Sequence, residues 1–180
     1  YFYPKMKEDK LAESVVKNEK KIVDKDKQSN VFEKVEYKGF YDFDNPFIIL
    51  SDKAYILAEE SNIVHMQKVK ITLDMKDGRT VIITGDKGVY NKETYDCYVE
   101  NNVKATDGET IINSENLDLI STKEAVSIYN NVKLITTSGS LVADKIDYNF
   151  EAKNYKISMF NDEKVKIKLV KWITLKNLEL

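Results

Sequence analysis

Apolar and polar residues alternate along most of the chain from Val31 onward, with turn residues between the alternating segments. The clearest segment alternates four apolar residues with polar ones: Val69, Ile71, Leu73 and Met75. Strict alternation places every second side chain on one face of a strand, and the Asp77-Gly78 pair that follows is a preferred hairpin turn. No window after residue 31 sustains the period of a helix. The pattern therefore predicts an antiparallel all-β fold built from hairpins.

The same unit recurs at a fixed interval. An acidic residue precedes a valine by 17 positions three times: Asp52 to Val69, Asp86 to Val103, and Glu115 to Val132. A fourth copy, Asp144 to Val165, is longer by four residues, and Asn161-Asp162-Glu163 marks the expected extra loop. Asn101-Asn102 and Asn130-Asn131 come just before two of the valines, where we expect tight turns with positive φ. Units this short must stack or pair to bury their apolar faces.

We expect two antiparallel sheets whose inner faces meet, as in a sandwich, a jelly roll or an open barrel. The terminal strands of such an array are free to pair with another chain. An inner face that does not close fully would hold acyl chains, whereas a dry core is the alternative. The candidate lipid-binding residues are apolar and predicted to face inward: Val69, Ile71, Leu73, Val103, Ala105, Ile128, Val132, Leu134, Ile157 and Met159. A shift of one residue in strand register would turn them outward.

Residues 5–30 are mostly charged and amide-bearing. We interpret residues 1–30 as a tether, flexible or partly helical, and residues 31–180 as the folded domain. The chain opens with Tyr1-Phe2-Tyr3-Pro4, and aromatic residues of this kind suit a membrane interface. They either border a membrane anchor that precedes Tyr1 or mark an arbitrary starting point.

Composition narrows the possible functions. The chain has 180 residues, with 28 basic and 30 acidic side chains and a single arginine, Arg79, so we expect no nucleic-acid partner. The one cysteine, Cys97, excludes an intrachain disulfide and reads as a small core residue. The one histidine, His65, has no second ligand for a metal and no partner for acid–base catalysis, so we assign it a structural or surface role. Three lysines, Lys70, Lys104 and Lys133, are expected to point outward into solvent.

Residues 39–54 carry a more specific pattern, in which Gly39 precedes two aspartates around an aromatic residue, a turn, and an apolar strand ending in Ser51-Asp52-Lys53-Ala54. Residues 80–88 match a second strand of the same kind. These segments resemble the LptC family of lipopolysaccharide export proteins, within the OstA-like β-jelly-roll group that also includes LptA. The resemblance covers residues 31 to about 170. The opening at Gly39 is not usual in LptA-like chains, so LptC is preferred.

The resemblance implies an open β-jelly roll in the periplasm of a Gram-negative bacterium, anchored in the inner membrane by one N-terminal helix that would precede Tyr1. It implies that the domain receives lipopolysaccharide from the LptBFG transporter, through LptF and LptG, and passes it to LptA. The acyl chains would lie inside the jelly roll, and no cofactor or catalytic residue is implied. One alternative is an LptA-like bridge without its own anchor. Another is a glycan-acting enzyme, although nothing marks a pair of acids as catalytic.

Overall fold

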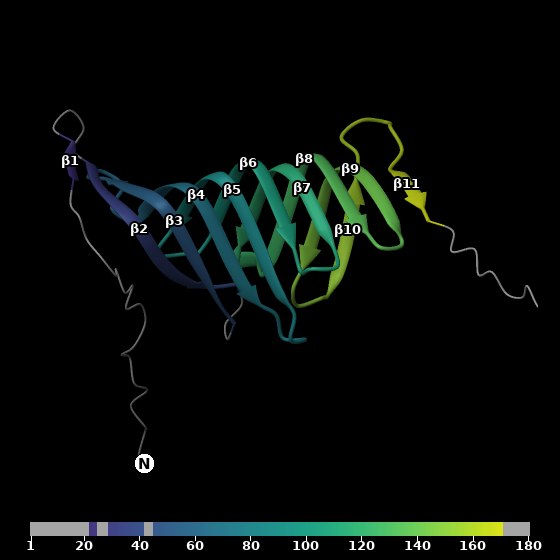
Figure 1. Ribbon diagram of the computed structural model, residues 1–180, viewed down its shortest axis with the longest axis horizontal. Helices are drawn as coiled ribbons and strands as arrows, with labels where there is room; N and C mark the ends of the chain where they lie inside the picture. Colours follow the sequence, from purple (N-terminus) through teal and green to yellow (C-terminus); the bar gives the residue numbers. More distant parts are fainter. Residues whose placement is uncertain (1–21, 25–28, 42–44, 171–180) are drawn as a thin grey trace, which may run out of the picture.

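The computed structural model describes residues 22–24, 29–41 and 45–170, which form one antiparallel sheet of eleven strands (Figure 1). The strands are β1 (Ile22–Asp24), β2 (Ser29–Phe40), β3 (Pro46–Leu57), β4 (Ile63–Asp74), β5 (Thr80–Asn91), β6 (Cys97–Thr106), β7 (Ile111–Ile120), β8 (Ala125–Thr136), β9 (Gly139–Asn149), β10 (Asn154–Ser158) and β11 (Lys166–Leu169). A single 3-10 turn, η1 (Ser121–Lys123), separates β7 from β8. Strands β1 to β10 pair in sequence order, and β11 pairs with β9. The predicted open all-β jelly roll is confirmed.

The two predicted layers are the two halves of the same long strands, within one hydrogen-bonded sheet. We define layer A by β10, which pairs with residues 145–149 of β9, and layer B by β11, which pairs with residues 139–142. Between these halves each long strand passes a corner. Contacts between strands that are not neighbours in the sheet, such as the ring contact of Tyr37 in β2 with Tyr90 in β5, bring the two layers together.

The asparagine pairs lie at this corner and not in turns between strands, which corrects the sequence interpretation. Asn101 and Asn102 have φ of 63° and 53° inside β6, and Asn130 and Asn131 have φ of 64° and 57° inside β8. The pairing of both strands with their neighbours shifts at these residues. Asparagine tolerates the left-handed conformation, so an irregularity here bends a strand without ending it.

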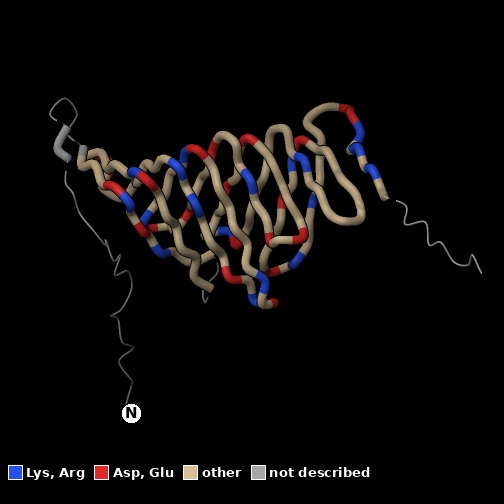
Figure 2. Tube along the Cα trace, in the orientation of Figure 1, with Lys and Arg blue, Asp and Glu red and all other residues tan. Residues whose placement is uncertain are grey.

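The corner explains the sequence repeat. We call the line of residues where the strands bend the corner row: Lys34, Asp52, Lys68, Asp86, Asn101, Asn102, Glu115, Asn130, Asn131 and Asp144. Lys34 Nζ lies 2.7 Å from Asp52 Oδ1, and Lys68 Nζ lies 2.5 Å from Asp86 Oδ1. Figure 2 shows basic and acidic residues interspersed along the strands. The acidic residue of each repeat therefore lies at a corner, and in the first three repeats the valine is the first inward residue of layer B after the next corner. The fourth valine, Val165, lies in the loop before β11.

The last pass through the sheet is broken in two. β10 ends at Ser158, the chain leaves the sheet, and β11 resumes at Lys166 on the other layer. The backbone N–H of Phe160 donates to Asp144 Oδ2 at 2.8 Å, which holds the departing chain against the corner of β9. The extra loop predicted around residues 161–163 is confirmed.

The region predicted to be a tether contains one strand that the sequence analysis did not anticipate. β1 pairs through Ile22, Val23 and Asp24 with the start of β2. Two other parts of the sequence analysis lie outside the described residues. They are the remainder of the predicted tether up to residue 28, which includes Tyr1-Phe2-Tyr3-Pro4, and the segment from Trp172 to the end. Within the described ranges, no helix has the length and apolar character needed to cross a membrane.

Candidate functional site

The space between the layers is closed at the N-terminal end of the sheet by aromatic side chains. Tyr37 and Phe47 of layer B pack on Tyr90 of layer A, with ring centroids 5.7 Å and 6.3 Å from that of Tyr90. The Tyr90 hydroxyl donates a hydrogen bond of 2.9 Å to the carbonyl oxygen of Lys38. Burial raises the pKa of both Tyr37 and Tyr90. These contacts fill the space between the layers at this end.

Toward the C-terminal end the layers border an apolar cavity of about 450 Å³ that is partly open to solvent. Layer B contributes Leu73, Ala105 and Leu134, and layer A contributes Leu117, Ile128 and Ile157. These side chains are aliphatic and shorter than the aromatic rings of the N-terminal end. The cavity extends to β10, the strand at the edge of layer A, where Tyr155 and Ile157 are exposed. An apolar cavity at the edge of a sheet is suited to hold hydrocarbon.

The structure divides the ten predicted lipid-binding residues into three groups. The lining of the cavity includes Leu73, Ala105, Ile128, Leu134 and Ile157. The closed core includes Val69, Ile71, Val103 and Val132. Met159 belongs to neither group, because β10 ends at Ser158 and Met159 begins the loop. Eight of the other nine are buried or half-buried, whereas Ile157 is 40% exposed at the edge of the cavity. Lys70, Lys104 and Lys133 are exposed. Lipid binding by the ten residues stays a prediction.

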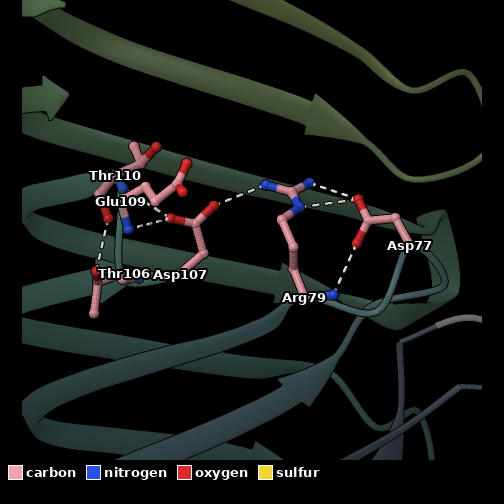
Figure 3. A network of polar contacts seen from close by, with 7 residues as sticks. Asp77, Arg79, Thr106, Asp107, Glu109 and Thr110 are labelled. Carbon is pink, nitrogen blue, oxygen red and sulfur yellow. Dashed lines mark hydrogen bonds and ion pairs between the residues drawn. The ribbon is translucent and has the colours of Figure 1, made fainter. Parts of the chain in front are cut away.

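A charged cluster that the sequence analysis missed lies at the layer B side of the cavity (Figure 3). Arg79, in the turn between β4 and β5, lines the cavity and bridges Asp77 and Asp107, with N–O distances of 2.8 Å to each. The backbone N–H of Thr110 donates to Asp107 and lowers the pKa of that carboxyl, and the Arg79 guanidinium adds to the effect. The hydrogen bond from the Arg79 side chain lowers the pKa of Asp77. The only signal in the sequence was that Arg79 is the single arginine.

The layer A side of the cavity carries an aromatic edge, which was also missed. Tyr148, Phe150 and Tyr155 all line the cavity. The centroid of the Tyr148 ring lies 5.3 Å from that of Phe150 and 4.6 Å from that of Tyr155. Phe150 also contacts Tyr41, which follows β2, at 4.7 Å. The apolar cavity is thus bordered by tyrosine on one layer and by an ion-pair cluster on the other.

Cys97 and His65 have the roles predicted for them. Cys97 is fully buried, and burial raises the pKa of its thiol. The His65 ring stacks on Tyr55 at 4.8 Å on the outer face of layer A, and its Nε2 lies 3.8 Å from Glu60 Oε2. In the part of the chain that the structure describes, no three His, Cys, Asp or Glu side chains are placed to hold a metal ion.

Comparison with known proteins decides the family. The model of the family described as lipopolysaccharide-assembly, LptC-related matches residues 9–159. The chain belongs to this family. The resemblance read from residues 39–54 is thereby confirmed, and the LptC-related family serves lipopolysaccharide transport in the cell envelope.

The solved structures include a similar fold. LptH from Pseudomonas aeruginosa, described as the LptA-homologous periplasmic component of the lipopolysaccharide transport device, superimposes with a TM-score of 0.52 at 15% identity. The match covers 71% of this chain and 95% of LptH. At this identity the likeness concerns the fold alone. No protein with a curated description matches the chain.

Proposed function

We propose that this LptC-related chain carries lipopolysaccharide across the periplasm, with the acyl chains in the cavity between the layers and the sugars in water. The apolar cavity of about 450 Å³ is the observation that carries the proposal. Each methylene that leaves water gains about 0.8 kcal/mol, so a lipid with several acyl chains needs a continuous apolar path.

The proposal includes the position of the chain in the export route. A helix before Tyr1 would anchor it in the inner membrane, with the folded domain in the periplasm. It would receive lipopolysaccharide from LptBFG, with LptF or LptG at the N-terminal edge formed by β1 and β2. LptA would join at the C-terminal edge, where β10 and β11 expose Tyr155, Ile167 and Leu169. Exposed edge strands accept a further strand from another chain.

Site-specific photo-crosslinking tests the conduit. A photoreactive amino acid at Leu134 or Ile128 lies on the cavity wall, whereas the same group at Lys133 or Ser127 lies on the adjacent outward position of the same strand. We expect purified lipopolysaccharide to crosslink at the two cavity positions and not at the two controls. Equal crosslinking at all four positions, or none in a folded protein, would contradict the proposal.

The likeness of the fold to LptH favours a second candidate, an LptA-like bridge subunit that joins end to end with copies of itself. Light scattering of the purified chain over a range of concentrations separates the two. Growth into filaments supports the bridge, and a monomer at all concentrations supports the anchored role.

A further inference from the structure

The charged cluster beside the cavity contains two aspartates in different situations. Asp107 is fixed: its Oδ1 accepts the backbone N–H groups of Glu109 and Thr110 at 3.2 Å and 2.8 Å, and its side chain is only 11% exposed. Asp77 lies in an open turn with 54% of its side chain exposed, and its Oδ1 accepts one backbone N–H, that of Arg79 at 3.1 Å. Arg79 lies between the two carboxylates (Figure 3), and Asp107 is the more buried of them.

The guanidinium presents a different edge to each aspartate. Nη1 contacts Asp107 at 2.8 Å, so one N–H group is committed to a fixed partner. Nε and Nη2 contact Asp77 Oδ2 at 2.9 Å and 2.8 Å. Those two groups form the planar fork that also fits a phosphate, and an exposed ion pair contributes little to stability. The Asp77 carboxylate can thus be exchanged for another oxyanion at small cost.

The residues around Arg79 indicate which oxyanion would replace the Asp77 carboxylate. Arg79 lines the same cavity as Leu73 and Ala105, so a hydrocarbon chain in that cavity leaves its head group beside the guanidinium. The Asp77 side chain can rotate away from the guanidinium, because 54% of it is exposed to solvent. A ligand with an anionic head group and an apolar chain can bind the Arg79 guanidinium and the apolar cavity at the same time.

We propose that Arg79 selects phosphate-bearing amphiphiles: a head-group phosphate replaces the Asp77 carboxylate on the Nε–Nη2 edge, while Asp107 keeps the guanidinium oriented. The inference rests on the proposed function, because it requires acyl chains in the cavity. In the unliganded protein Asp77 occupies the phosphate position and competes for it. Removing the charge of Asp77 should therefore strengthen phosphate binding, although it removes a contact seen in the structure.

Two single-chain amphiphiles test this directly, dodecyl phosphate and uncharged dodecyl maltoside, each below its micelle-forming concentration. Their dissociation constants are measured on the whole chain by displacement of an apolar fluorescent probe from the cavity. We expect R79Q to lose about tenfold in affinity for the phosphate and nothing for the maltoside, because a charge-assisted bidentate contact is lost. R79K keeps the charge without the fork and should lose most of the same preference.

The variants D77N and K104Q complete the test. D77N should bind dodecyl phosphate more tightly than the unaltered chain and dodecyl maltoside equally well. K104Q makes the same charge change as R79Q on an exposed outward residue of β6 and should leave both affinities unchanged. Circular dichroism establishes that each variant is folded. An unchanged phosphate preference in R79Q, or weaker phosphate binding in D77N, would overturn the role of Arg79.

Two further outcomes are distinct. If neither amphiphile displaces the probe from any variant, the proposed function itself fails, and with it the premise of this inference. Inorganic phosphate is added as a competitor to separate a lipid head group from free phosphate. Competition only at concentrations far above those of dodecyl phosphate supports the head-group role, and competition at equal concentrations assigns Arg79 to free phosphate and overturns it.

Discussion

The N-terminal and C-terminal ends of the sheet are made of the same bent strands, yet one is filled and the other is hollow. At the N-terminal end Tyr37, Phe47 and Tyr90 meet across the layers. At the C-terminal end the cavity is lined mainly by aliphatic residues, such as Ala105 and Leu134, with Tyr148, Phe150 and Tyr155 on its layer A side. The same alternating pattern thus serves both a core and a binding space.

The largest difference in the free energy of unfolding is expected when one large residue is truncated at each end of the sheet. Phe47→Ala leaves a void in the closed core and should lower the free energy of unfolding by about 3–5 kcal/mol, whereas Leu134→Ala enlarges an existing cavity and should cost about 1–2 kcal/mol. Urea unfolding of both variants measures this. Equal costs at the two positions would show that the two ends are packed alike.

A second, smaller effect concerns the hydrogen bond that closes the N-terminal end. Tyr90→Phe removes the hydroxyl that donates to the Lys38 carbonyl and should lower the free energy of unfolding by about 1–2 kcal/mol. The control is Tyr155→Phe, at the open end, where the side chain is 62% exposed and no comparable loss is expected.

The same residue gives the closed end a dependence on alkaline pH. Burial raises the pKa of Tyr90 above its ordinary value of 10.0, so the folded state favours the neutral phenol. The stability from this preference is fully present below pH 10 and is lost as the pH rises toward the folded-state pKa. Urea unfolding between pH 8 and about pH 11 should show a steeper fall for the unaltered chain than for Tyr90→Phe. Parallel curves would contradict the assignment.

The corner row runs from the N-terminal to the C-terminal end of the sheet, and a substitution in it should change stability through the backbone conformation of the substituted residue. Asn131 has a φ of 57°, which alanine adopts at a cost of about 1 kcal/mol and glycine adopts freely. We therefore expect Asn131→Ala to lower the free energy of unfolding by about that amount and Asn131→Gly to leave it nearly unchanged. Thermal unfolding of the two variants measures this difference. Equal losses of stability in both would mean that the asparagine side chain itself is needed.

The smallest global effect is expected at the open edge. A side chain at Gly139 would overlap the carbonyl of Lys168, so Gly139→Ala should detach β11 from β9. All four residues of β11 are exposed, so little apolar burial is lost. Hydrogen exchange at residues 166–169 should become fast while exchange in β2 to β8 is unchanged. Continued protection of β11 would contradict this placement.

Much of the fold could be predicted because it depends on local patterns. Alternation identified the inward face, so Val69, Val103 and Val132 are buried as expected. The Asp77-Gly78 turn and the interval of the repeat also needed no tertiary information. The asparagine pairs were assigned positive φ correctly, but a left-handed residue can either end a strand or bend it. The choice between those outcomes depends on pairing with strands on both sides.

The candidate site was predictable only in part, because its boundary is set by contacts between layers. Ile71 and Leu73 share a strand face and are both buried, yet only Leu73 is among the residues that line the cavity. Nothing within a strand distinguishes them. The pairing of Arg79 with Asp107 joins two turns that are 28 residues apart, and sequence spacing gives no access to such a contact. The error at Met159 arose from extending the alternation of β10 beyond the corner.

The sequential order of the strands has a consequence for how the chain folds. Each strand from β2 to β9 pairs with the strands immediately before and after it, so pairing within this part of the sheet begins from short connections; only β11 pairs out of order, with β9. Short loops cost little entropy to close, and β-proteins with local pairing fold faster than those with distant pairing. A hairpin that has already formed offers its free edge as a template for the next strand. The chain can therefore assemble in the order in which it emerges from a ribosome or a translocation pore, and each new strand covers the edge that was exposed before it.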